Sequence, residues 1–210
     1  MKSTFSKYMV LCIALLLLSE ITKKVLHFDE LLYDNLAEKL TSSQINSIFK
    51  MQEKWQWVGY IFFPLYVLLK TVIIASVAYV GIFFFSKQTI YFKQVWDIII
   101  KAEFIFLLVP LSKIIWFYYF DTNYTLEDIQ NFYPLAAINI TGYQGLEQWL
   151  VYPFQTLNLF ELAYIFYMAW QIGKITNTNQ DFGFKIIGYS YVPMLVLWMA
   201  VVMFFTLNYS

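Results

Sequence analysis

The chain has 210 residues, of which 60% are apolar, 21% aromatic and only 13% charged, whereas an ordinary soluble domain is roughly 25% charged. A soluble domain of this length could not bury so much apolar surface. The composition therefore predicts an integral membrane protein and excludes a disordered chain or a disulfide-rich secreted scaffold. The 14 basic residues, all of them lysine, only balance the 14 acidic residues, which excludes a nucleic-acid-binding protein.

Five segments are apolar enough, or nearly so, to cross the hydrocarbon core, which takes about 20 residues of helix. The predicted spans are residues 7–26, 57–86, 92–120, 155–174 and 184–207. The first has the length of a signal-peptide core, but no small-x-small cleavage pattern follows it, which favours an uncleaved span. The predicted fold class is an all-α integral membrane protein, a single domain of residues 1–210 with a bundle of five transmembrane helices.

Two connections between these spans have helical patterns of their own. Residues 27–56 are polar with an apolar stripe and are predicted to form two short interfacial helices, the second opened by a capping box of Thr41 and Gln44. A surface that docks a partner is the alternative reading of this segment. In the outer loop, residues 121–154, Thr125 is expected to cap a short helix, and a further interfacial helix leads into the fourth span. Interfacial helices are therefore expected in loops one and three.

Lysines near the span ends predict the orientation, because cytoplasmic loops retain more positive charge. One side receives Lys2, Lys7, Lys87, Lys93, Lys174 and Lys185, and the other receives Lys23, Lys24, Lys39, Lys50 and Lys54, all in the first loop. The outer loop and the C-terminus carry no lysine, so we place the N-terminus in the cytoplasm and the C-terminus outside, with Lys23 and Lys24 as counter-evidence. The lack of arginine and the many Lys, Ile and Asn residues are typical of an AT-rich bacterial genome. We therefore expect a multi-pass protein of the bacterial inner membrane.

Four of the ionisable residues inside the predicted spans are candidate functional residues: Lys70, Glu103, Lys113 and Glu161. Each costs roughly 2.5–3.5 kcal/mol at the bilayer centre unless it is paired or meets water. Their depths along the helices predict that Lys70 pairs with Glu103 and that Lys113 pairs with Glu161. The charges are structural if they only pair or snorkel, and functional if they line the path of an ion or solute.

The sequence contains no recognisable catalytic or metal-binding motif. Cys12 and His27 are the only residues of their kinds, so neither a disulfide nor a zinc site nor a Cys–His dyad can form within one chain. The sequence also lacks a glycine-rich phosphate loop and an HExxH motif. We therefore expect no enzymatic activity, no cofactor and no metal.

The second half of the chain carries a series of short motifs. Phe-Lys-Gln-Val (92–95) precedes a span, Leu-Asn-Leu-Phe (157–160) opens the next, which ends in Gln-Ile-Gly (171–173), and Phe184-Lys185 precedes a last span that contains Pro193. Over residues 88–207 this pattern resembles the five-pass membrane family of Ypt/Rab-interacting (Yip-type) proteins, in its bacterial branch. The resemblance implies five membrane passes. It does not extend to the large cytosolic N-terminal domain, so GTPase binding is not carried over.

These observations predict a non-enzymatic accessory or scaffold subunit of a larger inner-membrane assembly. Its expected partners are membrane lipid and other membrane-protein subunits or further copies of the chain, and no nucleic acid. The alternative is a component of a small-solute or ion transporter or channel that uses the buried Lys/Glu pairs.

Overall fold

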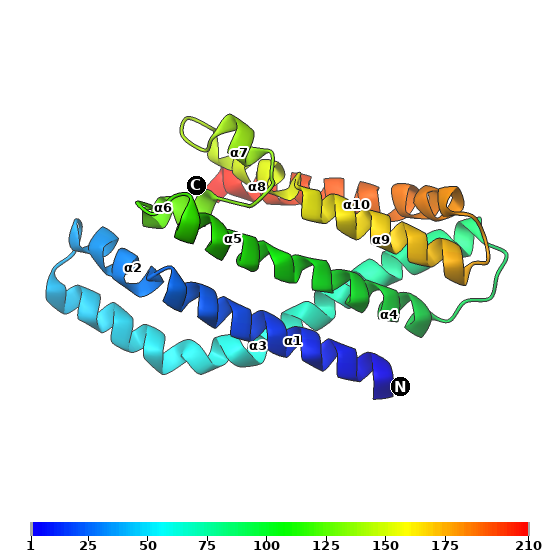
Figure 1. The fold of residues 1–210 in the computed structure, drawn as a ribbon, viewed down its shortest axis with the longest axis horizontal. Helices are drawn as coiled ribbons and strands as arrows, with labels where there is room; N and C mark the ends of the chain where they lie inside the picture. Colours follow the sequence, from blue (N-terminus) through cyan, green and yellow to red (C-terminus); the bar gives the residue numbers. More distant parts are fainter. Residues whose placement is uncertain (1, 210) are drawn as a thin grey trace.

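The computed structural model describes residues 2–209, and all regular elements in that range are helical (Figure 1). They are α1 (Lys2–Val25), α2 (Phe28–Ala37), α3 (Ser42–Phe85), α4 (Phe92–Glu103), the 3₁₀ turn η1 (Phe104–Leu107), α5 (Leu108–Tyr119), α6 (Leu126–Asn131), α7 (Ile138–Thr141), α8 (Gln148–Thr156), α9 (Leu159–Ile175) and α10 (Gln180–Tyr209). The predicted all-helical class is confirmed.

Three helices in the described range are long and apolar enough to cross a membrane: α1, α3 and α10. They coincide with the first, second and fifth predicted spans and indicate a membrane protein. The fourth predicted span corresponds to α9, which has 17 residues. The third corresponds to α4, η1 and α5, which follow one another without a loop.

The interruption at η1 has a local cause in Pro110. Proline has no N–H to donate to the carbonyl of Phe106, four residues earlier, and its ring crowds that carbonyl. The turn before a proline therefore tightens into 3₁₀ geometry, which is where η1 lies, directly after Glu103. This 3₁₀ turn contains Phe106 and directly follows Glu103, the last residue of α4.

The first loop differs from the prediction in one respect. Thr41 is the N-cap residue, and its N–H donates to the Gln44 side chain at 3.0 Å, as expected. The helix that begins there does not end before the second span, however, but continues to Phe85 as α3, 44 residues long. The prediction of a separate second interfacial helix is therefore wrong. Residues 42–56 have strong helix formers and no breaker before the apolar run, so helical hydrogen bonding simply propagates.

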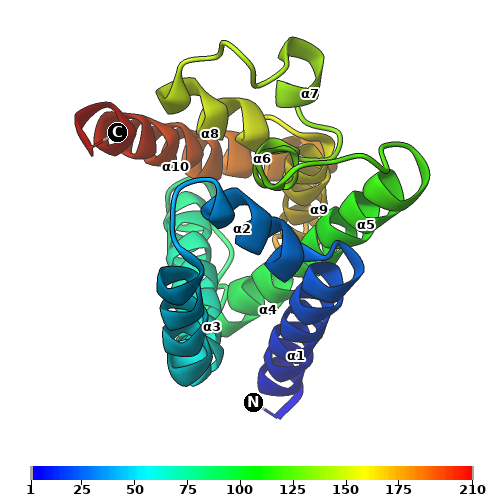
Figure 2. The same cartoon turned by 90° about the vertical axis from the view of Figure 1, so that its left-hand side faces the viewer.

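The helices form a bundle whose loops gather at two ends. The N-terminus, residues 86–91 and the turn between α9 and α10 lie at one end, while α2, α6 and the C-terminus lie at the other (Figure 1). At that second end α2 contacts α1, α3 and α6 (Figure 2). Thr125 caps α6 as predicted, its side chain accepting from the Asp128 N–H, and α8 corresponds to the expected interfacial helix.

The core lies where α3, α4, α9 and α10 meet. Most of its fully buried members are alanine or larger apolar residues, among them Ala75, Ala78, Ile99, Met168, Ile172 and Ile186. A second cluster joins α1 to α3 and α4 through Leu11, Val67 and Ile100. Many large apolar side chains face outward, among them Phe83 and Phe84, each 74% exposed, as expected of a surface in contact with lipid.

Glycines allow α10 to approach its neighbours closely. A Cβ added to Gly183 would lie 2.0 Å from the carbonyl oxygen of Ala169 in α9, and one added to Gly81 would lie 2.8 Å from Ser190 in α10. By contrast, a Cβ on Gly188, also in α10, would meet no atom within 4 Å. Small residues at helix crossings of this kind let backbones pack directly in membranes.

This difference predicts opposite effects for two substitutions in the same helix. Gly183→Ala should lower the free energy of unfolding by about 2 kcal/mol or more, because the backbone of α9 must move away. Gly188→Ala should leave it unchanged or raise it by up to about 1 kcal/mol, since alanine favours helix. Unfolding by dodecyl sulfate in mixed micelles measures both, and equal stabilities of the two variants would contradict the close contact.

Candidate functional site

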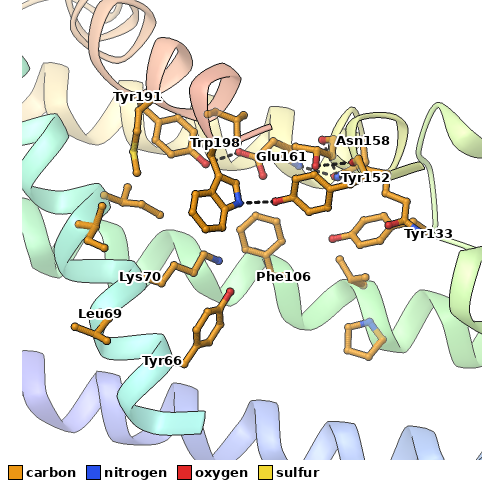
Figure 3. A pocket seen from close by; sticks show the side chains of 18 residues that line it. Tyr66, Leu69, Lys70, Phe106, Tyr133, Tyr152, Asn158, Glu161, Tyr191 and Trp198 are labelled. Carbon is orange, nitrogen blue, oxygen red and sulfur yellow. Dashed lines mark hydrogen bonds between the residues drawn. The ribbon is translucent and has the colours of Figure 1, made fainter. Parts of the chain in front are cut away.

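A cavity of about 600 Å³ lies between α3, α5, α8, α9 and α10 (Figure 3). It contains one acidic and one basic side chain, Glu161 and Lys70, within a lining that is otherwise aromatic, apolar or neutral polar. The aromatic members are Tyr66, Phe106, Tyr133, Tyr152, Tyr191 and Trp198. A volume in this range accommodates a small molecule.

The predicted pairing of Lys70 with Glu103 is confirmed. The Lys70 ammonium donates to Glu103 Oε2 at 2.8 Å, and the Tyr164 hydroxyl donates to Glu103 Oε1 at 3.1 Å. Glu103 is 3% exposed, and Tyr164 is fully buried. Lys70 also lies 4.7 Å from the centre of the Phe106 ring. This buried carboxylate therefore joins side chains of α3, α4 and α9.

The Glu161 carboxylate occupies a different position, in the first turn of α9. The side chain of Asn158 caps this helix by accepting from the Glu161 N–H at 2.8 Å, and the Tyr191 hydroxyl donates to Glu161 Oε1 at 2.6 Å. Among the side chains that the structure describes, no lysine ammonium lies within 4 Å of this carboxylate. Half-buried Glu161 is thus held by a neutral hydroxyl.

The contact between Glu161 and Tyr191 follows from how α9 and α10 cross. Ala169 and Gly183 mark the point of closest approach, and the two helices run antiparallel through a short turn (Figure 1). Glu161 is eight residues before Ala169 (169 − 161), and Tyr191 is eight residues after Gly183 (191 − 183). Equal offsets from the crossing bring the two side chains to the same height on facing helices.

The predicted pairing of Lys113 with Glu161 is wrong. The Lys113 ammonium donates to the backbone carbonyl of Ile129 in α6, at 2.5 Å. The prediction rests on the equal depths of Lys113 and Glu161 along their helices. Depth, however, does not specify the face of the helix on which a side chain lies. In the fold, Lys113 lies on the side of α5 that faces α1 and α6, beside a smaller cavity lined by Leu26 and Phe28 among others.

The wall of the main cavity at the α6–α8 end comes from the outer loop. The Ala137 N–H donates to the Leu157 carbonyl at 2.9 Å, and the Leu159 N–H donates to the Leu135 carbonyl at 3.1 Å. These two bonds tie the loop to the start of α9 and place Tyr133 in the lining. Burial, with the nearby carboxylate of Glu161 adding to it, raises the pKa of Tyr133 to about 12, so this hydroxyl stays neutral at physiological pH.

Three further lining residues had no signal in the sequence. Tyr152 and Trp198 come from α8 and α10, and the Trp198 indole N–H donates to the Tyr152 hydroxyl at 2.9 Å. The aromatic residues of this chain are so many, and its helices so uniformly apolar, that periodicity does not distinguish a cavity-lining ring from a lipid-facing one. For the same reason the sequence does not identify Tyr66 in α3 as a lining residue.

The chemistry available in the cavity is that of binding. It offers a carboxylate, an ammonium already paired with a buried carboxylate, amide and hydroxyl groups, and the faces of aromatic rings. In the part of the chain that the structure describes, no three His, Cys, Asp or Glu side chains cluster as metal ligands.

Comparison with known proteins gave no match: no protein-family model, curated protein or solved structure is detectably similar to this chain. The Yip-type resemblance of residues 88–207 therefore stays a prediction.

The Lys70–Glu103 pair predicts a strong non-additivity of substitutions. Lys70→Met alone should lower the free energy of unfolding in mixed micelles by about 3 kcal/mol, because it strands a buried carboxylate. The double variant Lys70→Met/Glu103→Gln should recover much of that loss. Lys7→Met, which breaks the more exposed pair of Lys7 and Asp97, is the control and should cost less than about 1 kcal/mol. If the loss in the double variant equals the sum of the losses in Lys70→Met and Glu103→Gln, the two charges do not interact.

Proposed function

We propose that this chain is a five-pass protein of the bacterial inner membrane that binds a small solute in the cavity between α3, α5, α8, α9 and α10, as a component of a transporter or channel. The observation that carries the proposal is the cavity itself, which contains Lys70 and Glu161 among helices of apolar composition. Charged groups inside membrane spans are costly, and where they face a cavity they mark the path of an ion or solute.

The lengths of the remaining helices support five passes. α9 has 17 residues and is therefore about 26 Å long at 1.5 Å per residue, close to the roughly 30 Å thickness of the hydrocarbon core. The continuous path from Phe92 to Tyr119 through α4, η1 and α5 is longer than α9. An odd number of passes also agrees with chain ends at opposite ends of the bundle (Figure 1).

The accessory or scaffold role, with other subunits or further copies of the chain as partners, stays a prediction. The outward-facing apolar side chains that would support it, such as Phe83 and Phe84, are equally expected for contact with lipid. Lys70, Glu103 and Glu161, by contrast, have no role in such a surface. For this reason solute binding is the function that the geometry favours.

The proposed orientation predicts which loops are accessible from outside the cell. In a Cys12→Ala background, Asn139→Cys in the outer loop should react with a membrane-impermeant maleimide in intact cells. Thr178→Cys, in the turn before α10, should react only after permeabilisation. Both side chains are exposed, so accessibility reflects the side of the membrane. The reverse labelling pattern would overturn the orientation.

The cavity itself is tested by its access to water. Thr156→Cys, in the lining, should react in proteoliposomes with a small charged methanethiosulfonate reagent. Thr71→Cys is the matched control, because Thr71 is fully buried and lies outside the lining. Similar slow rates at both positions would show that the cavity is closed to solutes and would contradict the proposed function.

A further inference from the structure

The charges around the main cavity do not balance. Two carboxylates, Glu103 and Glu161, lie near one ammonium, that of Lys70. Lys70 is bound to Glu103, which is almost completely buried. Glu161 is left with the hydroxyl of Tyr191 as its hydrogen-bond partner. Glu161 is therefore an acidic side chain of the lining that is not paired with an ammonium among the described side chains.

The aromatic side chains around this carboxylate favour one kind of positive charge. Rings of Phe106, Tyr152 and Trp198 surround the space below Glu161 (Figure 3). The Trp198 indole N–H donates to the Tyr152 hydroxyl, and both side chains line the cavity. Ring faces attract cations, and quaternary ammonium groups are the ligands that aromatic sites of this kind typically bind.

The wall of the cavity already holds a cation in this way. The Lys70 ammonium lies 4.7 Å from the centre of the Phe106 ring, within the range of about 6 Å over which such attraction acts. An ammonium group is therefore compatible with this lining when a carboxylate is within reach. For a second ammonium, that carboxylate is Glu161.

Other classes of ligand fit less well. An inorganic divalent cation prefers several oxygen ligands, commonly more than one of them charged, whereas beside Glu161 the lining supplies only neutral amide and hydroxyl oxygens. An anion would be repelled by Glu161 and would find Lys70 already bound to Glu103. A neutral solute would leave the carboxylate without a counter-charge.

We propose that the cavity binds a small organic cation, an ammonium with apolar substituents, whose charge pairs with Glu161 and whose substituents pack on Trp198, Tyr152 and Phe106. The proposal rests on the proposed function, because it names the class of solute for the same cavity.

The test compares three compounds of one shape: choline; dimethylbutanol, in which carbon replaces the quaternary nitrogen; and the anion dimethylbutanoate. Each is assayed in proteoliposomes for its ability to slow the labelling of Thr156→Cys. Choline should protect at a concentration about tenfold lower than the neutral compound, and the anion should protect least.

Substitutions test whether the preference for choline depends on the charge of Glu161. Glu161→Gln keeps an oxygen that can accept from Tyr191 and removes the charge, so it should abolish the advantage of choline. Asp181→Asn, which removes an exposed acidic charge at the start of α10, should retain it. If Glu161→Gln does not fold, Trp198→Leu and Trp198→Phe replace it: the preference for choline should fall with leucine and largely survive with phenylalanine.

The outcomes separate the two proposals. Labelling of Thr156→Cys that no compound slows, or that the neutral or anionic compound slows as well as choline does, overturns the organic cation while the open cavity stands. A choline preference that survives Glu161→Gln also overturns it. An absence of labelling at Thr156→Cys, with the control equally unreactive, overturns the proposed function.

Discussion

The buried carboxylate of Glu103 is the group on which the arrangement of α3, α4 and α9 depends. At 3% exposure it needs partners, and it finds them in Lys70 and Tyr164, one from each neighbouring helix. Between apolar helices in lipid, the hydrophobic effect gives little direction, because lipid tails are as apolar as the side chains. A charge that must be paired supplies that direction. It also fixes the position of Lys70, and through it one side of the cavity.

Close backbone contact fixes the opposite side. Gly183 lets α10 touch the carbonyl of Ala169, and from that crossing the antiparallel helices carry Tyr191 to Glu161. The space between the two sides persists because α8 and the outer loop cover it rather than fill it. Hydrogen bonds between the loop backbone and the residues around Asn158 hold this cover at the start of α9. The cavity is thus a consequence of a charge pair, a glycine contact and a tethered loop.

The remaining charged groups show the difference between a group that pairs and one that is only accommodated. Lys113 satisfies its ammonium on the carbonyl of Ile129, and Lys7 and Lys101 both bind Asp97 at the N-terminal end of the bundle. Each of these charged groups therefore already has a polar partner within the protein. Glu161 differs, because its side-chain partner is the neutral hydroxyl of Tyr191 and not an ammonium.

The sequence by itself determined the helical class, the apolar segments, the caps at Thr41 and Thr125 and the Lys70–Glu103 pair, since these depend on composition, local hydrogen bonding or depth along adjacent helices joined by a short loop. It did not determine that α3 continues through residues 42–56, that Lys113 turns towards α6, or that Tyr133, Tyr152 and Trp198 line one cavity with Glu161. Only the tertiary structure decided these points. The rotation of a uniformly apolar helix about its axis has no periodic signal in the sequence, and it is set by contacts between residues far apart in the chain.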